Sequence, residues 1–584
     1  MQATPASLTL DPSPGGRGKL RGSAAPTLKV TIMDRIWLNS YPPGIPADID
    51  IDHIPSLVDL FDTACRKYAD KVAYLSMGRS MSYRQLAEEV DAFAGWLQSR
   101  GIQKGDRVAL MMPNLLQYPV ALFGTLRAGG VVVNCNPLYT PRELEHQLRD
   151  SGATAIVIVE NFAQTLEQVI ARTAIKHVVV TPLGEMLGAK GLLVNFALRH
   201  VKKMVPAWKL PGAINFRGAM AAGRSHGCKP VALDQEDIAF LQYTGGTTGI
   251  SKGAILTHAN IASNVTQAHT WIKPVVHEGQ EFVITALPLY HIFALTANCL
   301  TFLMIGARNL LIVNPRDIAG LIKEWGKYPV SVVTGVNTLF NALLNHPDFA
   351  RLDFSTMNAT LGGGMAVQVP VAERWKQVTG VPLLQAYGLT ETSPAATINP
   401  LDMQDFNGSI GLPISSTEVS IRDDDGNEVS LKQVGEICIR GPQVMRGYWQ
   451  RPGETALVFH PDRFLRTGDI GYMDPKGFVF LVDRKKDMIL VSGFNVYPNE
   501  VEEAVAMHPG IMEVAAIGVF DEHSGEAVKI FVVRKDPALT EKALIEHCRG
   551  VLTGYKIPKH VEFRDDLPRT NVGKILRRAL KEQG

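Results

Sequence analysis

A stretch rich in glycine and hydroxyl residues has the composition of a phosphate-binding loop. Residues 244–253 read Thr-Gly-Gly-Thr-Thr-Gly-Ile-Ser-Lys-Gly and follow a short apolar run at 238–243. Glycines let backbone N–H groups approach phosphate oxygens closely, hydroxyl groups add donors, and Lys252 adds positive charge. A flexible turn is the alternative for any single loop of this composition. The order differs from that of a P-loop, because Gly253 follows the lysine where Ser or Thr is required.

Four later segments carry side chains that suit the other parts of a nucleotide. The ring of Tyr387 can stack on adenine, and Glu391 is a hard oxygen ligand of the kind that Mg²⁺ prefers. Asp469 can accept hydrogen bonds from two ribose hydroxyls, and Arg484 can donate to the same ribose. Lys574 can supply a cation where charge develops on a phosphate. Taken singly, Asp469 also suits a turn, and Glu391 and Lys574 also suit a solvated surface.

The composition is that of a globular protein with several structural units. The 584 residues are 46% hydrophobic and 20% charged, which excludes a largely disordered or fibrous chain. Lys and Arg total 59 against 57 Asp and Glu, so a net charge of +2 gives no general attraction for nucleic acid. The six cysteines lack CxxC and metal-ligand spacing, which indicates reduced thiols in a cytosolic protein.

Short β-branched runs alternate with longer amphipathic stretches from about residue 50, which is typical of βαβ units and parallel sheets. Strands are expected at 108–112, 131–134, 155–159 and 177–181, and helices at 114–128 and 161–173. After about residue 409, strands expected at 418–422, 436–440 and 478–482 are separated by Gly, Pro and Asp, which indicates a small antiparallel unit.

The predicted fold class is α/β. We expect a large N-terminal domain of βαβ-type sheets with a small β-barrel-like unit, followed by a small mobile α+β domain. The expected divisions are a disordered tail at 1–32, the large domain at 33–482, a hinge at 483–487 and the small domain at 488–584.

Two segments bear on targeting and membranes. Residues 1–32 lack the apolar stretch of a secretion signal, and periodic sequence begins near Met33, which we expect to be the natural start. The uncharged run at 282–307 is long enough to span a bilayer but contains Pro288 and His291. A buried strand, loop and helix is therefore the favoured interpretation of this run.

In their order along the chain, the five segments resemble the motifs of the adenylate-forming superfamily of acyl-CoA synthetases, adenylation domains and luciferases. Residues 243–253 resemble its AMP-binding motif and residues 385–392 its adenine and metal motif. The ribose motif, hinge and catalytic-lysine loop are matched at 466–471, 483–487 and 568–574. Within the superfamily, the runs 37–42, 482–500, 552–559 and 573–578 resemble bacterial long-chain fatty acid–CoA ligases.

This resemblance implies a reaction in two steps. A fatty carboxylate attacks the α-phosphate of MgATP to form an acyl-adenylate, and the thiol of coenzyme A then displaces AMP. The implied catalytic residues are Lys574 and Glu391, and the implied Mg²⁺ ligands are Thr244 and Glu391. The remaining implied ATP-binding residues are Gly245, Gly246, Thr247, Thr248, Gly249, Lys252, Tyr387, Gly388, Thr390, Asp469 and Arg484, together with Thr244.

The resemblance also implies a rotation between the two steps. The small domain turns about Lys486, which withdraws Lys574 and presents a thiol tunnel near Gly493. The implied walls of the acyl pocket are His291, Gly362, Gly363 and Gly364, although His291 suits a core histidine equally well. Some relatives place a Trp gate where this chain has Leu295, so such a gate is not assumed.

Two alternatives to a fatty acid–CoA ligase stay open from the sequence. One is an acyl-AMP ligase that loads a carrier protein, and the other is a silent nucleotide- or fatty-acid-binding protein. Intact Lys574 and Glu391 count against the silent protein. Homodimer formation is also left open.

An acid-free stretch predicts a membrane-facing helix. Residues 186–233 contain no Asp or Glu but eight Lys or Arg. On a helical wheel Leu193, Val194, Ala197, Leu198, Val201, Met204 and Val205 share one arc, opposite Asn195, Arg199, Lys202 and Lys203. A basic amphipathic helix suits an anionic membrane surface, whereas an ordinary docked helix with solvated cations is the alternative. We expect a cytoplasmic protein peripherally associated with the inner face of the cytoplasmic membrane.

Overall fold

The computed structural model describes residues 35–244, 251–570 and 573–582. The predicted tail, Met33 and residues 245–250 of the predicted phosphate loop lie outside the described residues. Residues from Ile36 onward form one compact unit.

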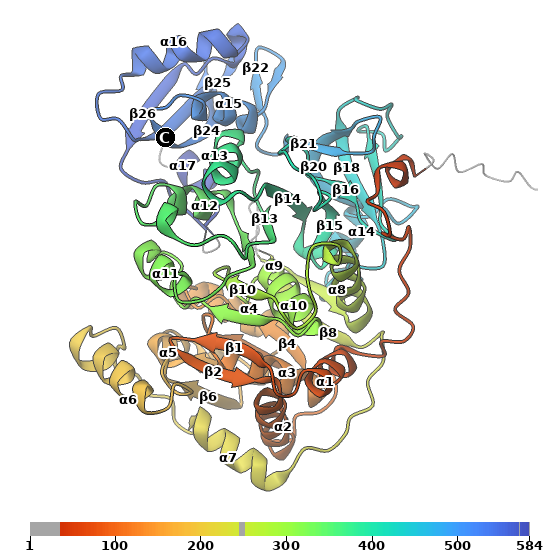
Figure 1. Cartoon of the computed structure of the whole chain (residues 1–584), viewed down its shortest axis with the longest axis vertical. Helices are drawn as coiled ribbons and strands as arrows, with labels where there is room; N and C mark the ends of the chain where they lie inside the picture. Colours follow the sequence, from red (N-terminus) through yellow and green to blue (C-terminus); the bar gives the residue numbers. More distant parts are fainter. Residues whose placement is uncertain (1–34, 245–250, 571–572, 583–584) are drawn as a thin grey trace, which may run out of the picture. The chain divides into compact units, whose positions relative to one another are not determined.

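An eight-stranded sheet has the order β19-β9-β8-β4-β3-β5-β6-β7 (Figure 1). The strands from β8 to β7 pair in parallel, while β9 and β19 are antiparallel. The strands are β3 (Arg107–Met111), β4 (Val131–Asn134), β5 (Ala155–Val159), β6 (His177–Thr181), β7 (Ile214–Asn215), β8 (Ile238–Tyr243), β9 (Gly253–Thr257) and β19 (Gly447–Tyr448). The strand predictions in this region are confirmed, the first to within one residue, because continuous β-branched runs suit strands that are buried on both faces.

Helices that connect these strands pack closely on one another. The helices α2 (Tyr83–Ser99) and α7 (Phe216–His226) approach so closely that a Cβ on Gly223 would lie 1.7 Å from the carbonyl oxygen of Ala92. The helix predicted at 114–128 is α3 (Gln117–Arg127). The helix predicted at 161–173 is wrong as one element. It is divided into η2 (Glu160–Phe162), α5 (Ala163–Glu167) and η3 (Ile170–Arg172), none of which starts with a side-chain cap.

A nine-stranded sheet has the order β16-β15-β14-β13-β12-β10-β11-β1-β2. Its strands are β1 (Val72–Ser76), β2 (Arg79–Ser82), β10 (Phe282–Thr285), β11 (Arg308–Leu311), β12 (Val332–Gly335), β13 (Ala359–Gly363), β14 (Leu383–Gly388), β15 (Ala395–Ile398) and β16 (Leu412–Pro413). Because β12, β13 and β14 pair in parallel, their carboxyl ends meet at one edge of the sheet. One hydrophobic core, which includes Trp96, Phe240 and Trp375, extends over both large sheets.

The remaining helices of this part of the chain are α1 (Leu57–Lys67), α4 (Pro141–Ser151), α6 (Ala189–Phe196), α8 (His258–Ile272), α11 (Ile318–Trp325), α12 (Asn337–Leu344), α13 (Val369–Thr379) and α14 (Pro452–Leu457). The uncharged run at 282–307 folds as β10, α9 (Ile292–Ala294), the π-helix η5 (Leu295–Thr301) and α10 (Phe302–Met304), as favoured from the sequence. Across the three described ranges, no helix has the length and apolar character needed to cross a membrane.

The predicted small β unit is a four-stranded antiparallel sheet, β17-β18-β20-β21. Its strands are β17 (Glu418–Arg422), β18 (Gly435–Arg440), β20 (Leu465–Met473) and β21 (Val479–Arg484). The strand β21 ends inside the predicted hinge, so this sheet carries Asp469 and Arg484 on paired neighbouring strands.

The last hundred residues build a separate five-stranded sheet with its own cores. The strands are β22 (Ile489–Val491), β23 (Phe494–Val496), β24 (Ile511–Asp521), β25 (Gly525–Arg534) and β26 (His560–Arg564), and the helices are α15 (Pro498–Ala506), α16 (Glu541–Val551) and α17 (Arg577–Lys581). Along β24, Val514 and Ala516 enter one core while Ala515 and Ile517 enter the other, which is the alternation expected of a strand. The predicted fold class is thereby confirmed, whereas the domain boundaries stay predictions.

Candidate active site

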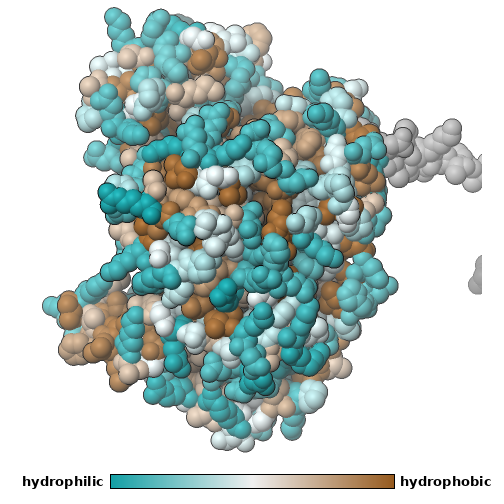
Figure 2. All heavy atoms as spheres, viewed as in Figure 1, coloured by the Kyte–Doolittle hydropathy of each residue, from teal (hydrophilic) through white to brown (hydrophobic). Residues whose placement is uncertain are grey.

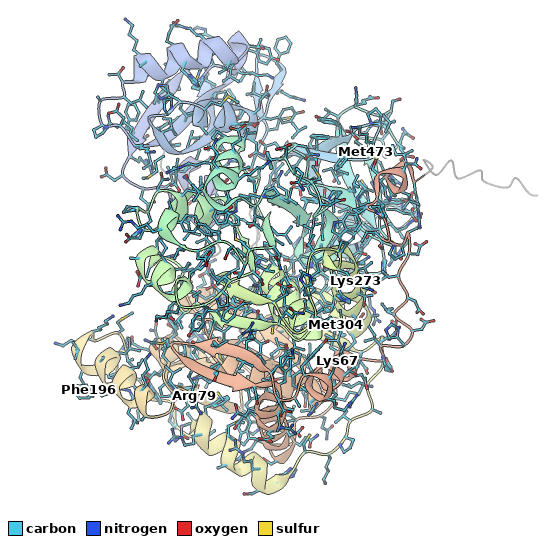
Figure 3. The ribbon with its side chains drawn as sticks, viewed as in Figure 1. Lys67, Arg79, Phe196, Lys273, Met304 and Met473 are labelled. Carbon is cyan, nitrogen blue, oxygen red and sulfur yellow. The ribbon has the colours of Figure 1, made fainter. Side chains whose placement is uncertain are left out.

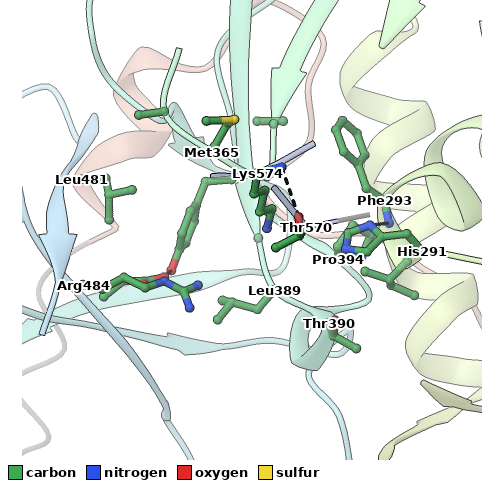
Figure 4. Close-up of a pocket in the computed structure, with 18 of the residues that line it drawn as sticks. His291, Phe293, Met365, Leu389, Thr390, Pro394, Leu481, Arg484, Thr570 and Lys574 are labelled. Carbon is green, nitrogen blue, oxygen red and sulfur yellow. Dashed lines mark hydrogen bonds and ion pairs between the residues drawn. The ribbon is translucent and has the colours of Figure 1, made fainter. Parts of the chain in front are cut away.

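A cavity of about 2160 Å³ lies at the carboxyl ends of β13 and β14. This volume exceeds the roughly 300–1,000 Å³ of a typical small-molecule site, so there is room for a nucleotide together with a second substrate. The small antiparallel sheet and the segment around Lys574 complete the walls. Figure 4 shows Lys574 between Arg484 and His291.

Tyr387, Asp469 and Arg484 form a connected polar cluster in this cavity. The hydroxyl of Tyr387 donates to Oδ2 of Asp469 at 2.6 Å, and Nε of Arg484 lies 3.0 Å from Oδ1 of Asp469. That Oδ1 is buried and has no hydrogen-bond partner of acceptable geometry. Coulombic attraction to Asp469 raises the pKa of Arg484, and burial raises the pKa of Tyr387 well above its usual value. The free acceptor fits a ligand that carries hydroxyl donors.

Glu391 lies in the short turn η7 (Thr390–Thr392), which follows β14 directly. The hydroxyl of Tyr448 donates to Oε1 of Glu391 at 2.7 Å, and the backbone N–H of Met445 donates to the Glu391 carbonyl at 2.7 Å. These contacts orient the carboxylate toward the cavity, which Thr390 and Gly388 also line. Among the described residues no group of three or more His, Cys, Asp or Glu is placed to hold a metal ion. A single carboxylate suits Mg²⁺ that is otherwise held by phosphates and water.

Lys574 enters the cavity from a loop that is fixed at both ends. Its N–H donates to Oγ1 of Thr570 at 3.1 Å, and Oγ1 of Thr338 in α12 donates to the carbonyl of Gly573 at 3.0 Å. A Cβ on Gly364 would lie 3.2 Å from Cε of Lys574, so the glycine at the end of β13 leaves space for this side chain. Burial, followed by repulsion from Arg484, lowers the pKa of Lys574 to about 8.

His291 lies on the side of Lys574 away from Arg484 (Figure 4), and its ring is neutral at physiological pH. Burial, followed by the charge of Lys574, lowers its pKa to about 3. Its Nδ1 accepts a hydrogen bond from the backbone N–H of Phe293 at 3.3 Å, which places the proton of the neutral ring on Nε2. His291 is therefore a cavity-lining donor, and the alternative of a purely internal core histidine does not describe its position.

The two described ends of the predicted phosphate loop also reach the cavity. Thr244 donates from its N–H to the carbonyl of Lys252 at 3.0 Å, so the two ends are held together. The ammonium of Lys252 pairs with Glu454 and lies 5.2 Å from the ring centre of Tyr448. A phosphate at this place must compete with Glu454 for Lys252.

Three other positions named from the sequence are not brought to the cavity. A Cβ on Gly362 would lie 2.5 Å from Cγ2 of Val367, so Gly362 faces packed protein, whereas Gly363 and Gly364 line the cavity. Gly493 lies in the turn between β22 and β23, where a Cβ would meet no other atom within 4 Å, and it is outside the lining. Leu295 is fully buried and does not line the cavity.

The sequence did not single out an ion network behind the hinge. Arg577 donates to both carboxylate oxygens of Glu502, at 2.9 and 2.8 Å, and lies 3.6 Å from Asp483. Asp483 is fully buried, and burial raises its pKa to about 6. The backbone N–H of Asn499 donates to its Oδ2 at 2.7 Å. These contacts join the end of β21 to α15 and α17 across Lys486, and no local periodicity indicates them because their partners are far apart in sequence.

A second feature that sequence analysis missed is a mixed wall of the cavity on α8 and η5, which is apolar on α8 at Ala268 and Ile272. Asn264, Ala268 and Ile272 recur every four residues and line the cavity along one face of the helix, opposite Thr296, Ala297 and Thr301 of η5. The four-residue spacing was the available signal, because it places side chains on one face of a helix.

Comparisons with known proteins agree with this geometry. The AMP-binding enzyme family matches residues 61–449, and the AMP-binding enzyme C-terminal domain matches residues 500–574. A long-chain-fatty-acid–CoA ligase of Escherichia coli O157:H7 is 60% identical over 554 residues, which are 94% of this chain and 98% of that protein. The crystal structure of ATP-bound MatB from Rhodopseudomonas palustris matches with a TM-score of 0.74 and 30% identity, over 90% of this chain and 98% of that chain. An anthranilate CoA ligase in complex with anthranoyl-AMP matches in fold, with a TM-score of 0.80 and 24% identity over 92% and 98% of the two chains. The chain therefore belongs to the AMP-binding enzyme family.

Proposed function

We propose that this protein activates a long- or medium-chain fatty acid with ATP, through an acyl-adenylate, and transfers the acyl group to coenzyme A with release of AMP and pyrophosphate. The observation that carries the proposal is 60% identity to a long-chain-fatty-acid–CoA ligase over nearly the full length of both chains. Lys574, Asp469 and Glu391 supply the matching chemistry in one cavity.

The first step needs a better leaving group on the fatty acid. A carboxylate oxygen attacks the α-phosphorus of ATP, and the bond from that phosphorus to the bridging oxygen of pyrophosphate breaks. Lys574 stabilises the negative charge that develops on the α-phosphate. Glu391, with Thr244, would hold Mg²⁺, which supplies further charge neutralisation on the phosphates. Oδ1 of Asp469, which is ion-paired with Arg484 but accepts no hydrogen bond, would accept from the ribose hydroxyls.

The cavity wall formed by α8 and η5, with Ala268 and Ile272 as its apolar part on α8, provides the place for the alkyl chain. From Asn264 to Ile272 the helix rises about 12 Å, and the lining residues of α8 below Asn264 are apolar. Ala395 and Ile398 of β15 add apolar surface, and α8 packs on η5. A π-helical segment such as η5 is frequent at functional sites, because it shifts side chains relative to a regular helix. With His291 at the inner end, the carboxylate would face the phosphates and the tail would lie along α8.

Ala268→Phe is expected to shorten the acyl chain that the enzyme accepts. The larger side chain fills the space along α8, and we expect kcat/KM for palmitate to fall about tenfold or more. The value for hexanoate should stay within about threefold of the wild type, because a short chain ends before this position. Parallel kinetics on acids of increasing length measure the change, and an equal loss for every acid would place the alkyl chain elsewhere.

The second step requires that Lys574 leave the acyl-adenylate and that the thiol enter. We assign the pivot to Lys486, which lies between β21 and the separate sheet of residues 489–564. Residues 33–482 and 488–584 would then move as two domains. Burial lowers the pKa of Lys486 to about 8, and the contacts of Asp483 with Asn499 and Arg577 cross this pivot. Gly493, which lies outside the cavity, would reach the adenylate only after rotation.

Lys486→Pro is expected to slow thioester formation at least about tenfold more than adenylation, because proline fixes φ at the pivot. Adenylation is measured by pyrophosphate exchange, and thioester formation from supplied acyl-adenylate and CoA. Lys486→Ala is the matched control, since it removes the same side chain and keeps φ free. If the proline and alanine variants show the same ratio of the two rates, the pivot is not at Lys486.

Two assays, pyrophosphate exchange and formation of acyl-CoA, separate the proposed function from its two alternatives. The ligase performs pyrophosphate exchange with fatty acid alone and forms acyl-CoA when CoA is added. An acyl-AMP ligase performs the exchange without accepting CoA, and a silent binding protein performs neither reaction. If the protein performs pyrophosphate exchange but forms no acyl-CoA, the proposed transfer to CoA is wrong, whereas the proposed adenylation still holds.

We further propose that the enzyme works in the cytoplasm, at the inner face of the cytoplasmic membrane, as a peripherally bound protein. A fatty acid partitions into bilayers, so attachment to the surface brings the enzyme to its substrate. Whether two copies associate is left open.

A further inference from the structure

The helix α6 carries an apolar face that no described part of the chain covers. It follows β6 and continues into the π-helical turn η4 (Ala197–Val201). Figure 1 shows α6 projecting beside β6, away from the sheets, and Figure 3 labels Phe196 on it. The exposed fractions are 73% for Leu193, 60% for Phe196 and 70% for Val201, and Leu192 and Met204 are also more than half exposed. We call these five residues the α6 apolar face, and Figure 2 shows hydrophobic surface at this place.

The rest of the helix is attached to the protein through the buried Gly191, the partly buried Val194, which packs against the large core, and two polar side chains. Oδ1 of Asn195 accepts from the backbone N–H of Gly184 at 2.8 Å. Arg199 donates through Nε to Oε2 of Glu160 at 3.1 Å, and Glu160 is buried. The helical wheel was therefore wrong in part, because Asn195 is half-buried against the protein and Arg199, although exposed, pairs with the buried Glu160 instead of standing free in solvent. Leu192 and Phe196, which the wheel left out of its apolar arc, are exposed instead. An ordinary docked helix buries nearly all of its large apolar side chains, whereas this helix packs Val194 against the core and leaves the α6 apolar face exposed.

Two cations without acidic partners lie at the C-terminal end of the α6 apolar face. Lys202 and Lys203 directly follow η4, are exposed, and form no ion pair with any residue in the described ranges. The N–H of Met204 donates to the carbonyl of Leu198 at 2.8 Å, and Lys203 has φ +49°, so the chain turns back at the end of η4. This turn keeps Met204 and both lysines at the same end of the helix. Because 186–233 contains no Asp or Glu, nothing in that stretch repels an anionic surface.

We propose that the α6 apolar face inserts into the surface of an anionic lipid bilayer while Lys202 and Lys203 bind its headgroups. A projecting helix with apolar residues at its outer side and lysines at its end matches the two layers of a membrane interface, acyl chains below and phosphates above. A soluble partner protein would need a groove to receive a convex helix. The absence of acidic residues from 186–233 would also have no evident role in binding such a protein. The proposal rests on the proposed function, because the acyl substrate dissolves in the same bilayer.

Co-sedimentation of the full chain with vesicles, without ATP or CoA, tests the insertion. The vesicles contain phosphatidylcholine alone or with one third phosphatidylglycerol. Phe196→Ser with Leu193→Ser should lower partitioning into anionic vesicles about tenfold or more, since two exposed apolar side chains no longer enter the bilayer. Lys202→Gln with Lys203→Gln should lower it about 30-fold at low salt, and less at high salt because screening already weakens the wild-type attraction. Phosphatidylcholine vesicles should bind the wild type more weakly than anionic ones.

Phe520→Ser is the matched control. Phe520 is an 83% exposed aromatic residue near the end of β24, so this variant removes exposed apolar surface from an element other than α6. It should sediment like the wild type. The proposal is overturned if both double variants sediment like the wild type. It is also overturned if the wild type ignores anionic vesicles, or if Phe196→Ser with Leu193→Ser changes the sedimentation coefficient in solution, which would assign this face to a second copy. Adenylation of fatty acids in detergent solution, assayed separately, should be unchanged in both double variants, and failure of the wild type with every acid from hexanoate to palmitate would contradict the proposed function without affecting the binding result.

Discussion

Lys574→Ala is expected to lower the rate of adenylation by about 10²–10³-fold while it leaves thioester formation from supplied acyl-adenylate within about threefold of the wild type. The lysine is the cavity cation that faces His291 across the site, and its loop is held there by Thr570 and Thr338. Removal of one preorganised donor to a developing oxyanion typically has an effect of this size. Pyrophosphate exchange measures the first step, and CoA-dependent release of AMP from acyl-adenylate measures the second.

Lys542→Ala controls for removal of a lysine from the same part of the chain, because Lys542 is exposed on α16. It should leave both steps unchanged. Comparable losses in the two steps for Lys574→Ala would contradict the assignment of Lys574 to the first step alone.

The pH dependence of adenylation gives an independent test of the role of Lys574. Since the pKa of Lys574 is lowered to about 8, its charge is present below that pH and is lost as the pH rises, so kcat/KM for adenylation should fall above about pH 8. Lys574→Arg should move this decline to higher pH.

Asp469→Asn is expected to lower kcat/KM for ATP by roughly 30- to 1,000-fold. Its Oδ1 is a buried acceptor without a hydrogen-bond partner, and its charge offsets that of Arg484. Hydrogen bonds to a charged group contribute about 1.5–3 kcal/mol each, and the amide loses the charge and offers one acceptor only. Adenylation kinetics over a range of ATP concentrations measure the loss.

A substrate without ribose hydroxyls separates direct binding from a folding defect. The wild type should discriminate strongly against 2′,3′-dideoxy-ATP, whereas Asp469→Asn should treat it nearly like ATP, because the interaction is already absent. Glu436→Gln is a useful comparison, since Glu436 is also buried in this small sheet and pairs with Arg466. It should keep the discrimination between the two nucleotides. Equal discrimination in the wild type and in Asp469→Asn would remove Asp469 from the ribose site.

The order of five local motifs was sufficient to predict the enzyme class, the fold class and the candidate residues at the cavity. The structure brings together Tyr387, Asp469, Arg484 and Lys574. Nothing in the sequence indicated that the hydroxyl of Tyr387 donates to the carboxylate of Asp469. Strands such as β5 and β6 were also predictable, because a run of β-branched residues that is buried on both faces is a local property.

Features that depend only on neighbouring residues were predictable from the sequence: the strand runs, the order of the motifs and the acid-free stretch before residue 234. Contacts between distant parts of the chain were needed to show that Gly362 faces Val367, that Arg577 lies near Asp483 across the predicted hinge, and that the α6 apolar face is exposed. The physical reason is that periodicity defines the faces of an element, but the partner of each face is set by distant contacts. For α6 those contacts are Gly184 and Glu160, which bind the polar side of the helix and leave the apolar side exposed.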